Sequence, residues 1–76
     1  MYTTEMAKAF HSIRPPKNFS VQLLDNDHFL VVRANEKEFM RLAEDGKREA
    51  IEYLAKVKSA LEQNGAIVLL VREGSE

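Results

Sequence analysis

Apolar residues near the start of the chain recur every three or four positions, which is the spacing of one face of a helix. This stripe consists of Met6, Ala9, Phe10 and Ile13. Thr3 or Thr4 can cap the helix, because a hydroxyl accepts from the free amides of the first turn. Arg14-Pro15-Pro16 stops it, since the residue before a proline avoids the helical region. The pattern predicts a short amphipathic helix over residues 3–13.

The apolar spacing changes to every second residue at Phe19. Phe19, Val21 and Leu23 share one side, as in a strand with one apolar face. The turn-forming residues of 25–27 (Asp-Asn-Asp) follow, and a run rich in β-branched and aromatic residues spans 28–33. The two segments predict a β-hairpin.

A long helical pattern begins after Asn35, which is a good N-cap, and Glu38 is expected to complete a capping box. Its apolar stripe consists of Phe39, Ala43, Gly46, Ala50, Leu54, Val57 and Leu61. The pattern ends at Asn64-Gly65, where glycine suits the left-handed residue that closes a helix.

One continuous helix over residues 36–63 would be roughly 42 Å long, whereas strands of six or seven residues reach only roughly 20 Å. The stripe keeps its phase through Gly46, which favours one helix. The length mismatch and the turn dipeptide Asp45-Gly46 favour a break, because glycine costs about 1 kcal/mol inside a helix. We therefore expect a kink or short loop near Asp45–Lys47.

The last segment, 66–71, is apolar on both faces and predicts a strand reached by a helical crossover. Such crossovers are right-handed and join parallel strands. The predicted fold class is α+β in the order α-β-β-α-α-β, a three-stranded mixed sheet with the helices packed on one face. Residues 1–76 are expected to form one domain. Residues 1–18 would be the first helix and its Pro-Pro connector, 19–72 a ββααβ core, and 73–76 a tail.

Composition excludes several classes of protein. The chain has 76 residues, a formal net charge of −1 and no cysteine, so disulfide scaffolds and thiolate metal sites are ruled out. The longest apolar run is far shorter than the roughly 20 residues of a membrane span. No basic-then-apolar leader precedes the first helix, so the expected location is the cytoplasm and no membrane contact is expected.

The sequence holds little catalytic chemistry. Asp25, Asp27 and Glu36 are spaced like the start and end of a calcium-binding loop, but Phe29 and Leu30 occupy positions that require a polar ligand and a glycine. The two histidines lie far apart, and three glycines cannot build a phosphate-binding loop. We therefore expect no enzymatic activity, no catalytic residue, no metal site and no cofactor.

Basic residues give one functional hint. They are Arg14 and Lys17 before the hairpin, and Arg41, Lys47 and Arg48 around the expected break. Lys47 and Arg48 could meet a phosphate at a helix N-terminus, where free amides attract anions. Glu44 and Asp45 would oppose this, and the simpler interpretation is a solvated helix face with Glu–Lys pairs.

The run Glu49-Ala50-Ile51-Glu52-Tyr53-Leu54 resembles the second helix of some small bacterial KH proteins. The predicted element order also resembles the type II KH fold, which ribosome-binding factor A and the BolA-like proteins share in outline. KH domains grip single-stranded nucleic acid with a G-x-x-G loop between two helices. Residues 42–48 carry one glycine and two acids there, so the resemblance is to a degenerate member in which a kink replaces the loop.

Two functions follow from these observations. The first is a non-enzymatic binding module whose partner is another protein or a second copy of the chain, giving a homodimer. Its interface would be the uncovered sheet face, with Phe29, Val31 and Leu69. The alternative is a KH-like protein that binds single-stranded RNA or a ribosome weakly. A nearly neutral net charge argues against tight RNA binding, because that affinity comes from phosphate neutralisation.

Overall fold

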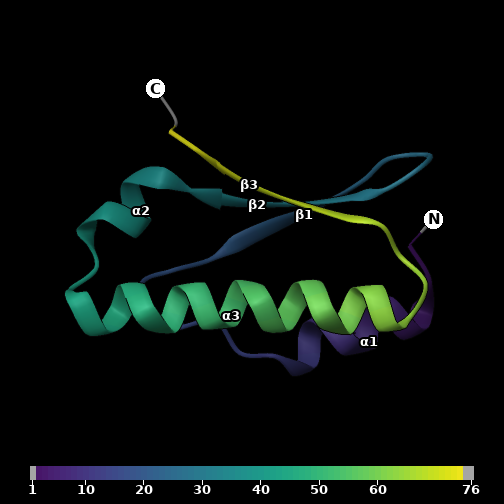
Figure 1. Cartoon of the computed structure of the whole chain (residues 1–76), viewed down its shortest axis with the longest axis horizontal. Coiled ribbons are helices and arrows are strands. Elements are labelled where there is room, and N and C mark those ends of the chain that lie inside the picture. The colour runs from purple at the N-terminus through teal and green to yellow at the C-terminus, as the bar shows by residue number, and fades with distance from the viewer. Residues whose placement is uncertain (1, 75–76) are drawn as a thin grey trace.

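The computed structural model describes residues 2–74 and contains three helices and three strands in the predicted α-β-β-α-α-β order. Figure 1 shows the arrangement of these elements. They are α1 (Thr4–Ser12), β1 (Val21–Asp25), β2 (Leu30–Asn35), α2 (Glu36–Arg41), α3 (Glu44–Gln63) and β3 (Val68–Glu73). The α+β fold class is therefore confirmed.

The sheet is mixed and its central strand is β2. It pairs antiparallel with β1, through Val21↔Ala34 to Asp25↔Leu30. It pairs parallel with β3, through Leu30↔Val68 to Asn35↔Glu73. Helices α1 and α3 pack side by side below the sheet in Figure 1, while the short α2 lies at the end of β2. No element of residues 2–74 covers the opposite face, which we call the open face.

The core lies between the sheet and α3. Leu61 and Val57 of α3 are fully buried, as are Val32 and Leu30 of β2, and Met6 of α1 closes one end. The apolar stripe of the long helical pattern predicts that Leu54 and Leu61 pack against the sheet, together with Val21 or Leu30. That prediction is confirmed for Leu54, Leu61 and Leu30. Val21 is half-buried and packs against the same cluster.

All three strands begin about two residues later than the sequence pattern predicts. The first begins at Val21 rather than Phe19, and the third runs to Glu73, so the tail predicted from residue 73 begins no earlier than Gly74. Its last two residues lie outside the described chain. Phe19 is buried although it precedes β1, because its ring meets those of Phe39 and Tyr53 edge to face, with centroids 6.3 Å apart in each pair. An apolar residue can join the core without joining a strand.

The break in the long helix exists, but its predicted position is wrong. Helix α2 ends at Arg41 and α3 begins at Glu44, so Leu42 and Ala43 form the break. Residues 45–47 lie in the first turn of α3, where the Lys47 amide donates to the carbonyl of Ala43 at 2.8 Å. Gly46 serves a close contact with Leu42 rather than a turn, because a Cβ atom at Gly46 would lie 3.2 Å from Leu42 Cβ.

The cap of α2 is only half as predicted. The Asn35 side chain accepts from the amides of Lys37 and Glu38, at 2.8 and 3.1 Å, and so it is the N-cap. The Glu38 carboxylate does not complete a capping box. It accepts from the Ser20 amide at 3.1 Å and from the Ser20 hydroxyl at 3.4 Å, joining α2 to the residue that precedes β1.

Candidate interaction surface

Three apolar side chains from three different strands form one row across the open face. Leu24 of β1 lies opposite Val31 of β2, which lies opposite Leu69 of β3. Leu24 and Leu69 are 40 % and 47 % exposed, and Val31 between them is half-buried. Large contiguous apolar patches on a protein surface mark contact sites.

Two further residues extend this row toward the β1–β2 turn. Phe29 comes two residues before Val31 and is half-buried, and Ile67 comes two residues before Leu69 and is 66 % exposed. Successive side chains of a strand alternate between faces, so both positions share the open face with the row. We call these five residues the apolar patch. They are Leu24, Phe29, Val31, Ile67 and Leu69.

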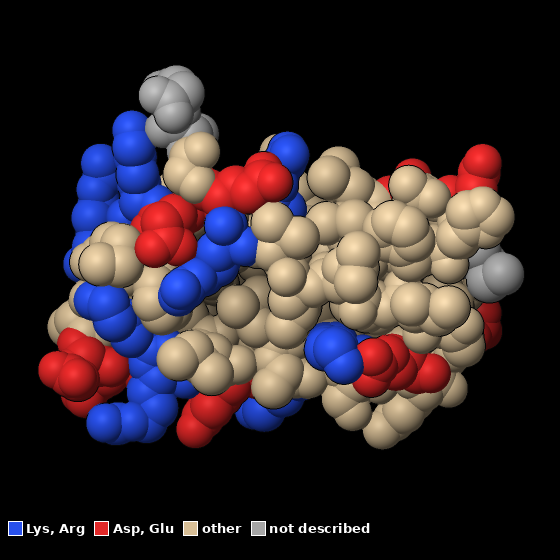
Figure 2. Space-filling model, turned by 45° about the horizontal axis from the view of Figure 1, so that its top comes forward, with Lys and Arg blue, Asp and Glu red and all other residues tan. Residues whose placement is uncertain are grey.

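The open face becomes polar at the opposite end of the sheet. The Arg33 guanidinium donates to Gln22 Oε1 with both Nε and Nη2, and its Nη1 lies 3.6 Å from the Glu73 carboxylate. Gln22 and Arg33 are partners in register, whereas Glu73 lies opposite Asn35, two residues after Arg33 on the same face. Figure 2 shows uncharged residues over the middle and right of the molecule, and charged residues gathered at the left. On this face most of the charged residues therefore gather at one end of the molecule.

The basic residues predicted to bind nucleic acid do not form one site. Arg41 borders a hollow with Phe19 and Glu38, whereas Arg14 borders another with Glu49 and Tyr53. Lys17 is exposed in the connector before β1.

Two of these cations are engaged within the protein. Lys47 Nζ donates to the carbonyl of Leu42 at 2.6 Å and to that of Met40 at 3.3 Å, so it caps the C-terminal end of α2. Arg48 pairs with Asp45 at 3.8 Å. The N-terminus of α3 has no side-chain cap, and its first turn carries Glu44 and Asp45. Two carboxylates beside the free amides oppose the binding of a phosphate there.

The predicted interface residues Phe29, Val31 and Leu69 all belong to the apolar patch. The structure places Leu24 on the open face and Phe19 in the core. The sequence pattern missed Ile67 and also Ile51, which is 58 % exposed on α3. Ile67 lies within the apolar run of residues 66–71, so no alternation in the sequence marked it as exposed.

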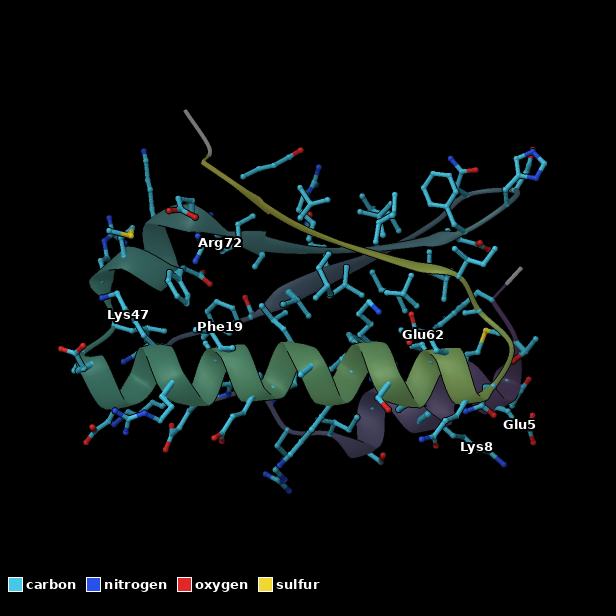
Figure 3. The ribbon with its side chains drawn as sticks, viewed as in Figure 1. Glu5, Lys8, Phe19, Lys47, Glu62 and Arg72 are labelled. Carbon is cyan, nitrogen blue, oxygen red and sulfur yellow. The ribbon has the colours of Figure 1, made fainter. Side chains whose placement is uncertain are left out.

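A stacked arginine closes the side of the fold next to the end where charged residues gather. The guanidinium of Arg72 lies 4.3 Å from the centre of the Phe39 ring, and its Nε is 3.1 Å from the Glu36 carboxylate. Figure 3 shows Arg72 directed from β3 toward α2. Cation–π contact and ion pair together fix the end of β3 against α2.

Neither a metal centre nor a membrane span is found among the described residues. Across residues 2–74, no three acidic or histidine side chains gather closely enough to hold an ion. None of the helices in that range combines the length and apolar character needed to cross a bilayer.

Comparisons with known proteins found no similar protein. No protein-family model, no curated protein sequence and no solved structure matches the chain.

Proposed function

We propose that the protein is a non-enzymatic interaction module that self-associates through its sheet. The observation that carries this proposal is the row Leu24–Val31–Leu69, in which every strand contributes an apolar side chain to an uncovered face. Burying apolar area is favourable by about 25 cal/mol per Å². A second copy offers the same patch, and a two-fold axis lets one surface serve both partners.

The size of the chain supports an interface that extends beyond this row. A standard protein interface buries about 800 Å² on each partner. The accessible surface of the described residues is 5256 Å², so such an interface would take roughly 15 % of it. A domain of this size also buries a smaller share of its surface on folding than a larger domain does. Association would therefore bury further apolar surface in addition to that of the small core.

Sedimentation across a range of protein concentrations tests the proposal. We expect the solution mass to rise from 8.7 kDa toward twice that value as concentration increases. Leu69→Lys places a charge in the patch and should shift the association to at least about tenfold higher concentration. Gln63→Lys adds the same charge at an exposed position of α3 and is the matched control. A wild-type chain that stays at 8.7 kDa at millimolar concentration would exclude self-association.

The same samples separate this function from RNA binding. A single-stranded RNA oligonucleotide is added at low salt, where phosphate contacts contribute most. RNA binding by a chain that remains a monomer would favour the KH-like alternative.

A further inference from the structure

Strand β3 forms one edge of the sheet and directs unpaired backbone groups away from β2. The Leu30 amide donates to the carbonyl of Ile67 at 2.8 Å, so the backbone of Ile67 faces β2. Backbone groups alternate along a strand, and those of Val68, Leu70 and Arg72 therefore face outward. The N–H and C=O groups along such an edge can form hydrogen bonds with another strand.

An apolar groove runs beside this edge, between β3 and α3. Its walls include Leu70, which is 41 % exposed, together with Ile51 and Ala55 of α3. Ile51 is a large apolar residue, and its side chain is 58 % exposed on a helix that carries many charged residues. In Figure 1, β3 and α3 lie together on the side of the molecule nearest the viewer, while α1 and β1 lie behind. Edge and groove thus share one face.

We propose that a second copy of the chain docks on this face, with the two β3 strands paired antiparallel about a two-fold axis at Leu70. The inference rests on the proposed self-association, and it assigns the contact to the edge of β3 and the groove rather than to the open-face row. The two sheets become one of six strands, and the two α3 helices lie antiparallel beside each other. The open faces join into one continuous surface on the same side.

About this axis, the outward-facing residues of the two β3 strands lie opposite one another. Leu70 of one copy lies opposite Leu70 of the other as a hydrogen-bonded pair, and Val68 lies opposite Arg72 on both sides. All three outward-facing residues of each copy then find a partner. A symmetric register centred on Leu69 or Val71 also pairs outward-facing residues with one another, but it sets Arg72 or Val68 opposite a residue outside β3.

The charges along α3 favour the antiparallel arrangement. Lys47 lies seven residues before Leu54, and Glu62 lies seven residues after Ala55, so the two are symmetric about the centre of the groove. Figure 3 shows them near opposite ends of α3. A two-fold axis at this centre brings Lys47 of each copy toward Glu62 of the other. Within each copy Lys47 donates to the carbonyls of Leu42 and Met40, and Glu62 pairs with Lys58, so the contact between copies is an additional one. About the same centre Leu54 lies opposite Ala55, and Ile51 lies opposite Lys58.

The area of the contact also favours the edge. The apolar patch alone comprises five side chains, whereas a stable dimer removes about 800 Å² from each copy. Edge pairing buries Leu70, the groove and the exposed flank of α3 together, and it places Leu69 of one copy opposite Val71 of the other on the open face. The interface is then continuous with the apolar patch.

Single cysteines test the geometry, because the chain has none of its own. Opposed residues of a hydrogen-bonded antiparallel pair have Cα atoms about 5.5 Å apart, within the range of about 4.4–6.8 Å that a disulfide spans. Leu70→Cys is therefore expected to form a covalent dimer under mild oxidation. Leu69→Cys is the matched control, being adjacent and similarly exposed but not opposite its own copy. We expect it to cross-link at least about tenfold more slowly.

A second pair of variants does not depend on cross-linking. Ile51→Glu changes an exposed helix residue in the groove and should raise the concentration needed for dimerisation by about tenfold or more. Met40→Glu changes an equally exposed apolar residue of α2 that does not line the groove, and it should leave dimerisation within about threefold of wild type. Leu24→Glu changes the open-face row and separates edge pairing, which it should spare, from face-to-face packing, which it should disrupt. Circular dichroism confirms that all three variants fold.

The outcomes distinguish this inference from the proposed function. Cross-linking at Leu70→Cys, with loss of the dimer in Ile51→Glu, supports edge pairing. A dimer that Leu24→Glu disrupts and Ile51→Glu spares would be packed face to face, which overturns the edge model and keeps self-association. A wild-type chain that remains a monomer overturns both.

Discussion

A Cβ atom on Gly46 would lie 3.2 Å from the Cβ atom of Leu42, closer than most side-chain contacts allow. The two residues belong to the first turn of α3 and to the break that precedes it. The break turns the chain from the end of β2 back beneath the sheet, and Leu42 packs on the core as it does so. Glycine at position 46 lets the chain turn this tightly.

Replacing Gly46 with alanine tests this relationship. Alanine would ordinarily stabilise a helix by about 1 kcal/mol relative to glycine. Here the close contact with Leu42 should cancel that gain, so we expect Gly46→Ala to leave the free energy of unfolding unchanged or lower, by urea titration. Ser59→Ala, an exposed position of α3, is the control and should show a gain of a few tenths of a kcal/mol. A gain near 1 kcal/mol at Gly46 would show that Leu42 moves aside freely.

Periodicity predicted the elements of this fold better than their ends. The helical stripe ran through Gly46 without a change of phase, so the sequence pattern gave no sign that the break lies at Leu42–Ala43. The start of β1 was misplaced because Phe19 follows the strand alternation but packs on Phe39 and Tyr53 instead. Such tertiary contacts are invisible to a local pattern.

The carboxylate of Glu38 is a second contact that joins distant segments. It accepts from the amide and the hydroxyl of Ser20, eighteen residues earlier. Because a net hydrogen bond contributes about 0.5–1.5 kcal/mol, Glu38→Ala should lower the free energy of unfolding by about that amount. Glu49→Ala, at an exposed position of α3, should change it by less than about 0.5 kcal/mol. Equal effects of the two changes would mean that only the lost charge matters.

Burial of the Leu61 side chain holds α3 against the sheet. Its side chain is fully buried, and removing three carbons from such a site costs about 2–5 kcal/mol. We expect Leu61→Ala to approach complete unfolding at 37 °C, because a domain of this size has little stability to lose. Met40→Ala removes a similar volume at a 58 % exposed position and should be nearly neutral. A loss below 0.5 kcal/mol for Leu61→Ala would contradict the position of α3.

The candidate surface was only partly predictable. Val31 and Leu69 followed from strand alternation once the helices were assigned to one face. The groove beside β3 did not, because it requires knowing that β3 is an edge strand and that Ile51 lies next to it. Strand order depends on tertiary packing and leaves no local mark in the sequence.

Burial raises the pKa of the Tyr53 phenol above its ordinary value of 10.0. The folded protein therefore keeps this proton at pH values where the unfolded chain releases it. The resulting stability is complete below pH 10 and is lost as the pH rises from 10 through the folded-state pKa. We expect Tyr53→Phe to show a smaller fall in stability above pH 10 than wild type, measured by urea titration at several pH values. Parallel pH profiles for the two proteins would contradict this role.

Lys47 and Arg48 are neighbours in sequence but should differ in what they do. Lys47 donates to two carbonyls at the end of α2, whereas Arg48 forms one exposed ion pair. Lys47→Met keeps most of the side chain and removes these bonds, so it should lower the free energy of unfolding by about 0.5–1.5 kcal/mol. Arg48→Met should change it by less than about 0.5 kcal/mol, since exposed pairs contribute little.

Adding single-stranded RNA at low salt to the same two variants separates a structural lysine from a phosphate ligand. If Lys47 caps α2, its replacement lowers stability and leaves RNA behaviour the same as in Arg48→Met. If both residues hold a phosphate, both variants keep wild-type stability, and each reduces the slope of log affinity against log salt by about 0.7. Glu44 and Asp45 lie in the first turn of α3 and repel a phosphate there, so we expect the first result.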